Sequence, residues 1–206
     1  MFAKRSISRT FSILFILVFM LAQVTPAYAA GLVVNSLLDN TNDDSICTLR
    51  EAIRNANDNA QTYDDCPAGS GADTITFSVS GTITLGSILP DITDAAGLTI
   101  DGTGQTVTIS GNHALRVMKV GNYAVLTLNN LMITNGLDYP YDNYGGGGIL
   151  NFGTLTITNS AFSGNSATDG GGILNAGILT ITNSTFSGNS ANWGGGIENG
   201  DTLTIT

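Results

Sequence analysis

The chain has 206 residues, only 11% of them charged, and a formal net charge of −9. Proteins bind nucleic acids through Lys and Arg, so seven basic residues against 16 acidic ones exclude a nucleic-acid-binding protein. Two cysteines and one histidine are too few for a metal-ligand set, and we expect neither a metal ion nor a cofactor.

Residues 1–29 are predicted to be a secretory signal peptide. Three basic residues lie within the first nine positions, and an apolar run follows over residues 11–22. Residues 27–29 have the small-x-small pattern of a cleavage site. The mature chain is therefore expected to begin at Ala30, with four basic and 16 acidic residues and a net charge of −12.

The apolar run of the predicted signal peptide is shorter than a membrane-spanning helix requires. The sequence thus predicts an exported protein that has no transmembrane helix once the signal is cleaved. Its expected address is extracellular or at the cell surface, associated with the outer membrane or the cell wall.

Residues 30–72 are predicted to form an N-terminal capping segment with one helix. Thr48 and, three residues later, Glu51 have the spacing of a capping box. The apolar residues of this helix repeat at helical spacing and share one face: Leu49, Ala52, Ile53 and Ala56. We expect the helix to cover the open end of the β-structure that follows, because an open end leaves a strand edge unpaired.

Cys47 and Cys66 flank the predicted helix. In an exported protein an even number of cysteines suggests a disulfide. By closing a loop in the unfolded chain, this disulfide would stabilise the fold by about 3 kcal/mol. Two separate thiols are the alternative.

Residues 73–206 are predicted to form a three-sided parallel β-helix. Over the last third of the chain a 24-residue period aligns Gly146 with Gly170 and Gly194, Asn151 with Asn175 and Asn199, and Leu155 with Leu179 and Leu203. A fixed period of this length is typical of solenoids, in which each repeat forms one coil and stacked coils bury a common core. Residues 73–136 carry degenerate versions of the same coil.

Within each repeat the hydrophobic pattern has a period of two. In residues 154–158 Leu and Ile alternate with Thr, so one face of a strand is buried and the other is in water. Two further short apolar stretches begin at Ile149 and Phe162. Each coil is therefore expected to hold three strands of a right-handed parallel β-helix. The aligned asparagines are expected to form side-chain amide ladders between coils.

Five residues are inserted between two of the coils, where the spacing of equivalent residues rises from 24 to 29. The insertion is predicted to lie in residues 138–144, which hold Tyr139, Tyr141 and Tyr144. These tyrosines are candidate ligand-binding residues, because an aromatic-rich loop on a solenoid wall can contact a carbohydrate or a partner protein. A corner insertion that packs on its own coil is the alternative.

Asp169, Trp193 and Glu198 are the other candidate ligand-binding residues. They lie near the glycine corner of neighbouring coils, and Asp169 and Trp193 align at one period, which is expected to place one above the other. Plain turn residues are the alternative. Glycoside hydrolases need paired carboxylates, and the acids of the regular coils are few and scattered, so no catalytic residue is predicted. One group of basic residues is interpreted as a solvated strand: His113, Arg116 and Lys119.

The segment around the predicted helix resembles a known family. Cys47-Thr-Leu-Arg-Glu-Ala-Ile53, followed by Ala56-Asn57, is similar to the CSLREA-type N-terminal domain of exported bacterial β-helix proteins. Thr48 stands where that family has Ser. The resemblance implies a β-helix and an extracellular address, without a defined activity.

The repeats resemble a second family. Gly-Gly-Gly-Ile, together with Phe162-Ser-Gly-Asn165 and Phe186-Ser-Gly-Asn189, is similar to the GGA-I/L/V and FxxN motifs of the chlamydial polymorphic outer-membrane proteins. The third position here is Gly instead of Ala. Those proteins are β-helical autotransporter passengers that act as adhesins, so the resemblance implies a fold and an adhesive role.

Together these patterns predict a secreted or cell-surface β-helix with a structural or adhesive role and no catalytic activity in this segment. Its expected partner is a surface carbohydrate or a protein of a host or neighbouring cell. The alternative is a carbohydrate-active β-helix, similar to polysaccharide lyases or hydrolases, whose catalytic coils lie outside this segment. Since the sequence stops at Thr206 in mid-strand, we expect a fragment of a longer protein and self-association at the open C-terminal coil.

Overall fold

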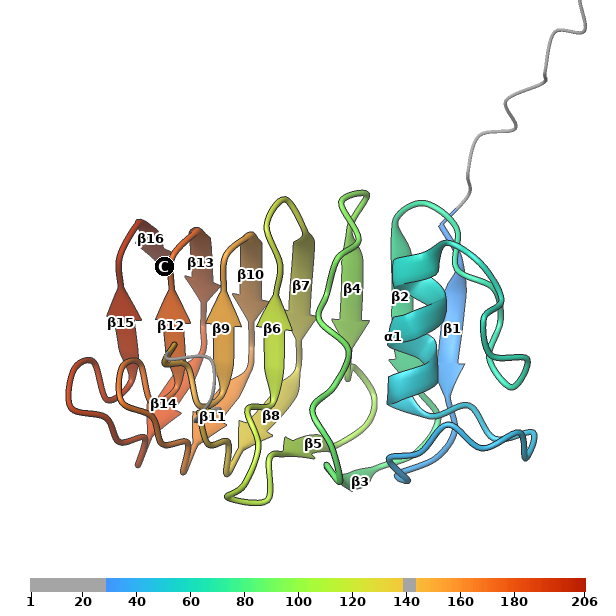
Figure 1. Ribbon diagram of the computed structural model, residues 1–206, viewed down its shortest axis with the longest axis horizontal. Coiled ribbons are helices and arrows are strands. Elements are labelled where there is room, and N and C mark those ends of the chain that lie inside the picture. Colours follow the sequence, from blue (N-terminus) through green and yellow to red (C-terminus); the bar gives the residue numbers. More distant parts are fainter. Residues whose placement is uncertain (1–28, 139–143) are drawn as a thin grey trace, which may run out of the picture.

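The computed structural model describes residues 29–138 and 144–206. The predicted signal peptide, up to residue 28, lies outside the described residues. The described chain is a parallel β-solenoid with one short helix, as the sequence predicts (Figure 1). Strands of successive coils stack beside one another along the long axis, and each coil passes through three walls, named A, B and C here.

Wall A has seven strands: β1 (Gly31–Val34), β2 (Asp73–Phe77), β4 (Leu98–Asp101), β7 (Val125–Asn129), β10 (Thr154–Thr158), β13 (Ile178–Thr182) and β16 (Thr202–Ile205). Wall B has five: β3 (Gly81–Thr84), β5 (Val107–Ser110), β8 (Leu131–Thr134), β11 (Ala161–Ser163) and β14 (Thr185–Ser187). Wall C has four: β6 (Met118–Val120), β9 (Ile149–Asn151), β12 (Ile173–Asn175) and β15 (Ile197–Asn199). A regular coil therefore holds three strands, one in each wall, which confirms the prediction.

The core runs through the lumen as ranks of identical or similar aliphatic side chains. Leu155 pairs with Leu179, and Ile157 with Ile181, across β10 and β13, and all four side chains are buried. In wall B the rings of Phe162 and Phe186 stack with centroids 4.7 Å apart. In-register stacking follows from the 24-residue period, because each coil places the same side chain at the same corner or wall.

Outward-facing positions of wall A carry hydroxyls instead. Its central rank is threonine in six successive strands: Thr74, Thr99, Thr127, Thr156, Thr180 and Thr204. The β-branched side chain of Thr suits an exposed strand, and its hydroxyl keeps the wall wettable although few residues are charged.

Asparagine amide ladders join the coils, as predicted. The amide of Asn151 donates to Oδ1 of Asn175 at 2.7 Å, and the amide of Asn175 donates to Oδ1 of Asn199 at 2.7 Å. Asn151 and Asn175 are fully buried. A second ladder runs from Asn165 to Asn189 at 2.9 Å. Because a buried amide without a partner destabilises a fold, these ladders favour in-register coils over any shifted stacking.

The glycine corners follow from close backbone packing. Gly170 has a φ of +62°, and a Cβ atom there would lie 2.3 Å from the carbonyl oxygen of Ile173. A Cβ on Gly171 would lie 2.5 Å from a backbone oxygen of the next coil. Only glycine tolerates both the left-handed conformation and this approach, so the repeated glycine runs are structural.

Helix α1 (Leu49–Asp58) begins at the predicted capping box, with Thr48 as its N-cap. The predicted apolar stripe is buried. In Figure 1 the helix stands in the same row as the strands of wall C, at the N-terminal end. Asn57 donates to the carbonyl of Asp91 at 2.8 Å and accepts from the backbone N–H of Thr93 at 2.9 Å. The helix therefore takes the place of a wall C strand in the first coil, while its predicted covering of an open end stays a prediction.

Residues 30–72 also contribute a strand that the sequence analysis did not predict. Strand β1 pairs in parallel with β2 and extends wall A, with Leu32 and Val34 buried. Cys47 and Cys66 form the predicted disulfide, with their Cα atoms 4.8 Å apart. The backbone N–H of Asn35, directly after β1, donates to the carbonyl of Cys47 at 3.1 Å. The segment thus belongs to the solenoid through strand pairing as well as through its helix.

The carboxyl group of Glu51 is fully buried in the capping box. Its Oε2 accepts from the backbone N–H of Thr48 at 2.9 Å, while Oε1 has no hydrogen-bond partner within the described part of the chain. Burial raises the pKa of Glu51 above its ordinary value, although hydrogen bonds from Thr48 oppose the shift. Nearby carboxylates at Asp65 and Asp44 raise this pKa further.

We expect Asn175→Ala to lower the free energy of unfolding by about 3 kcal/mol, because it leaves buried amide and carbonyl partners unpaired on two neighbouring coils. Asn192→Ala is the matched control, since Asn192 is an exposed asparagine outside the buried ladder and its replacement should change stability by less than about 0.5 kcal/mol. Urea unfolding followed by circular dichroism measures both. Equal losses in the two variants would contradict a stabilising role for the buried ladder.

Glu51→Gln should become more stable relative to the wild type as pH rises. A raised pKa means that the folded protein holds the proton more tightly than the unfolded chain. The resulting stabilisation is complete below the unfolded pKa and is lost as pH rises through the folded pKa. Gln keeps the capping box without a buried charge. Urea midpoints of both proteins at pH 4 and pH 7.5 measure the effect, with Glu198→Gln as control. A pH-independent difference for Glu51→Gln would contradict it.

Candidate ligand-binding site on wall C

The insertion between coils lies where the sequence predicts it. Before it, Leu137 pairs with Ser166 at the 29-residue spacing, and after it Ile149 pairs with Ile173 at the 24-residue spacing. The extra residues therefore fall in the corner that leads into wall C. Of the three candidate tyrosines, Tyr139 and Tyr141 lie outside the described residues, and Tyr144 lies within them.

Arg116 holds the C-terminal end of this insertion. Its guanidinium donates to the carbonyl oxygens of Tyr144, Gly145 and Gly146, each at 3.0 Å. Only 3% of Arg116 is exposed, so its interpretation as part of a solvated strand is wrong, whereas His113 is exposed. A buried guanidinium needs several acceptors to offset its desolvation, and here backbone carbonyls supply them.

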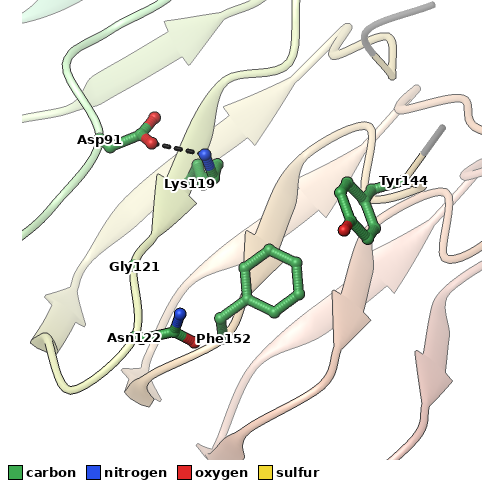
Figure 2. Close-up of a pocket in the computed structure, with 6 residues that line it drawn as sticks. All are labelled: Asp91, Lys119, Gly121, Asn122, Tyr144 and Phe152. Carbon is green, nitrogen blue, oxygen red and sulfur yellow. Dashed lines mark hydrogen bonds and ion pairs between the residues drawn. The ribbon is translucent and has the colours of Figure 1, made fainter. Parts of the chain in front are cut away.

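A pocket of about 470 Å³ lies on the outer face of wall C, beside the insertion (Figure 2). The residues that line it are Asp91, Lys119, Gly121, Asn122, Tyr144 and Phe152. The rings of Tyr144 and Phe152 meet edge to face, with centroids 5.3 Å apart and planes at 84°. Nζ of Lys119 lies 2.5 Å from Oδ2 of Asp91. The pocket thus combines an aromatic pair with an ion pair.

Three successive coils supply these side chains. Lys119 is the middle residue of β6 and points outward, because Met118 and Val120 on either side of it are buried. Asp91 precedes Ile92, which bridges to Val120, so its carboxylate lies one coil below Lys119. Phe152 directly follows β9, the next strand of wall C. Strand register therefore fixes where each group lies.

The other predicted candidates lie further along the same side of the solenoid. Asp169 and Trp193 pair across neighbouring coils, as the sequence predicts, and 65% of Trp193 is exposed. Glu198 lies on β15 in the outward rank of wall C that begins at Lys119. Tyr144 is the candidate that lines the pocket of Figure 2; Asp169, Trp193 and Glu198 do not line it. Whether any of them binds a ligand stays a prediction.

Sequence reasoning missed four lining residues, Asp91, Gly121, Asn122 and Phe152, and gave the fifth, Lys119, no binding role. Asp91 and Asn122 lie in degenerate coils, where no repeat shows which positions face outward. Phe152 carried a usable signal, because the equivalent positions one and two periods later are Ala176 and Gly200. A single large aromatic at an otherwise small position marks a local departure from the repeat.

The described residues were also compared with the requirements of a metal site and of a membrane-spanning helix. Across residues 29–138 and 144–206, no group of three or more His, Cys, Asp or Glu side chains is arranged to hold a metal ion. Within the same ranges, no helix has the length and apolar character needed to cross a membrane.

Comparison with known proteins gives one short match. Residues 183–200 match the repeat of the Chlamydia polymorphic membrane proteins. The matched segment runs from just before β14 to just after β15 and contains the FSGN motif and the third glycine corner. The chain is therefore similar to that repeat in sequence, as the motifs predicted. No curated protein and no solved structure matches the chain. The resemblance to the CSLREA-type domain stays a prediction.

Arg116→Leu should lower the free energy of unfolding by about 3 kcal/mol, because two buried carbonyls and one part-buried carbonyl lose a charged donor. Arg54→Leu is the matched control. Arg54 lies on the exposed face of α1, so its replacement should change stability by less than about 0.5 kcal/mol. Urea unfolding measures both variants. A loss for Arg116→Leu no larger than for Arg54→Leu would show that the guanidinium does not anchor the insertion.

Proposed function

We propose that the chain is an exported β-solenoid that acts at the cell surface in a structural and adhesive role, without catalysis by this segment. The observation that carries the proposal is the match of residues 183–200 to the repeat of a family of chlamydial membrane proteins. The matched segment holds β14 and β15, two strands of one coil, in a stack whose other coils are built in the same register. The match and the fold therefore point to the same kind of protein.

The construction of the solenoid supports a displayed scaffold. Strands of neighbouring coils pair throughout the stack, and amide ladders also join the regular coils from β9 onward. Stacked repeats of this kind make a rigid rod with an extended surface. Side chains on its walls recur at the strand spacing of about 4.8 Å, which suits repeated contacts with a partner surface.

The cysteines support export. Cys47 and Cys66 are bonded to one another, and such structural disulfides persist in oxidising compartments outside the cytosol. The predicted signal peptide and the resemblance to the CSLREA-type domain both imply the same address.

Surface display and adhesion are tested in the cells that produce the chain. An epitope-tagged full chain should be removed by protease added to intact cells, because the proposal places it outside the cell. Deletion of its gene should lower attachment to host or neighbouring cells several-fold, and re-expression should restore it. A tag protected until the cells are lysed, or unchanged attachment after deletion, would contradict the proposal.

The non-catalytic part is tested separately with the purified chain. Incubation with a panel of plant and bacterial polysaccharides should leave their chain lengths unchanged by chromatography. Shortened products that disappear on heat denaturation of the protein would instead indicate a carbohydrate-active enzyme.

A further inference from the structure

We infer that the pocket on wall C is a binding site for a neutral glycan, formed by Tyr144 and Phe152 together with Asn122 and the Lys119–Asp91 pair. This inference rests on the proposed adhesive role, for which it names the site and the class of ligand. The pocket has a volume of about 470 Å³, which lies within the range of about 300–1,000 Å³ that small-ligand pockets occupy.

The lining matches the two kinds of surface that a sugar ring presents. A pyranose has an apolar C–H face and a rim of hydroxyls. Tyr144, 51% exposed, and the half-buried Phe152 supply aromatic surface for the C–H face. Towards sugar hydroxyls the Asn122 amide can donate and accept, the Lys119 ammonium donates and the Asp91 carboxylate accepts. Asn122 lines the same pocket as Phe152 (Figure 2).

The ion pair retains hydrogen-bonding capacity. An ammonium group has three donors, and the contact with Asp91 uses one of those of Lys119. The side chains of Lys119 and Asp91 are 33% and 41% exposed. Hydroxyls of a bound sugar can therefore reach both groups while the pair stays intact.

The aromatic platform is held in place before any ligand arrives. Buried Arg116 donates to the carbonyl of Tyr144 itself and to the two carbonyls that follow. The edge-to-face contact with Phe152 further limits the orientation of the Tyr144 ring. Binding then costs little conformational entropy, since the contacting side chains are already ordered.

Charge selects a neutral glycan over an anionic one. Asp91 compensates the positive charge of Lys119, so the pocket offers no uncompensated cation to a carboxylate or sulfate group. The chain as a whole carries a net charge of −9 and repels polyanions at low salt. Uncharged oligosaccharides avoid this repulsion.

The test uses the full chain and an array of oligosaccharides. The neutral probes are cello-, chito-, xylo- and manno-oligosaccharides, and oligogalacturonate and alginate fragments are the anionic probes. We expect binding to at least one neutral series. Tyr144→Ala, and separately Asn122→Ala, should weaken its Kd about tenfold, because Tyr144 provides stacking surface and Asn122 provides hydroxyl contacts.

Ile178→Ala is the matched control, because Ile178 is an exposed apolar residue of wall A, outside this pocket; its Kd should stay within about twofold of the wild type. Circular dichroism checks that each variant is folded. Trp193→Ala tests the rival candidate: binding that is lost in Trp193→Ala but kept in Tyr144→Ala would overturn the assignment to this pocket.

A purely anionic preference, or no glycan binding at all, would also overturn the inference. Cells that still attach through the chain when it carries Tyr144→Ala would reject the glycan pocket and leave the adhesive role standing. Cells that never depend on the chain for attachment would reject the proposed function itself.

Discussion

The in-register stacking of identical residues on neighbouring coils is the constraint on which the rest of the structure depends. A buried asparagine needs hydrogen-bond partners, and Asn151 and Asn175 each find one in the aligned asparagine of the next coil. A slip of one residue would send every lumen side chain into solvent. Backbone pairing, the aliphatic ranks and the amide ladders therefore all require the same register. Because these three interactions favour one structure, a chain rich in Gly, Thr and Asn can fold with few charged or aromatic residues.

This constraint also decides where the fold can vary. Extra residues inside a strand would break the ladders, so the insertion between coils lies at a corner, between Leu137 and Ile149. A corner insertion leaves backbone carbonyls away from any strand partner. From the preceding coil, Arg116 donates to three carbonyls where the insertion ends, those of Tyr144, Gly145 and Gly146. The most irregular part of the solenoid is thus supported by its one buried guanidinium within the described chain.

The residues that follow the repeat and the residues that line the proposed binding pocket are largely different sets in this molecule. The motif residues of the segment that matches a known repeat, residues 183–200, are a glycine corner, a lumen phenylalanine and aligned asparagines, which have structural roles here; the same segment also holds the candidates Trp193 and Glu198. The pocket is built from residues that depart from the repeat, such as Phe152 and Tyr144. The match to the repeat therefore supports the architecture and the proposed surface role, whereas the departures from the repeat supply the chemistry of the proposed binding pocket.

The sequence by itself determined the coil, the walls, the amide ladders, the capping box and the place of the insertion, because each depends on local periodicity or on spacing that repeats. It did not reveal β1, the burial of Arg116 or the pocket. Leu32 and Val34 are too short a pattern to identify a strand, and Arg116 reads as a polar residue on a degenerate coil. Only the tertiary structure brought Asp91, Lys119 and Phe152 together from three coils. The physical reason is that strand register between coils of unequal length decides which of these side chains lie next to one another. No single segment of the sequence encodes that register.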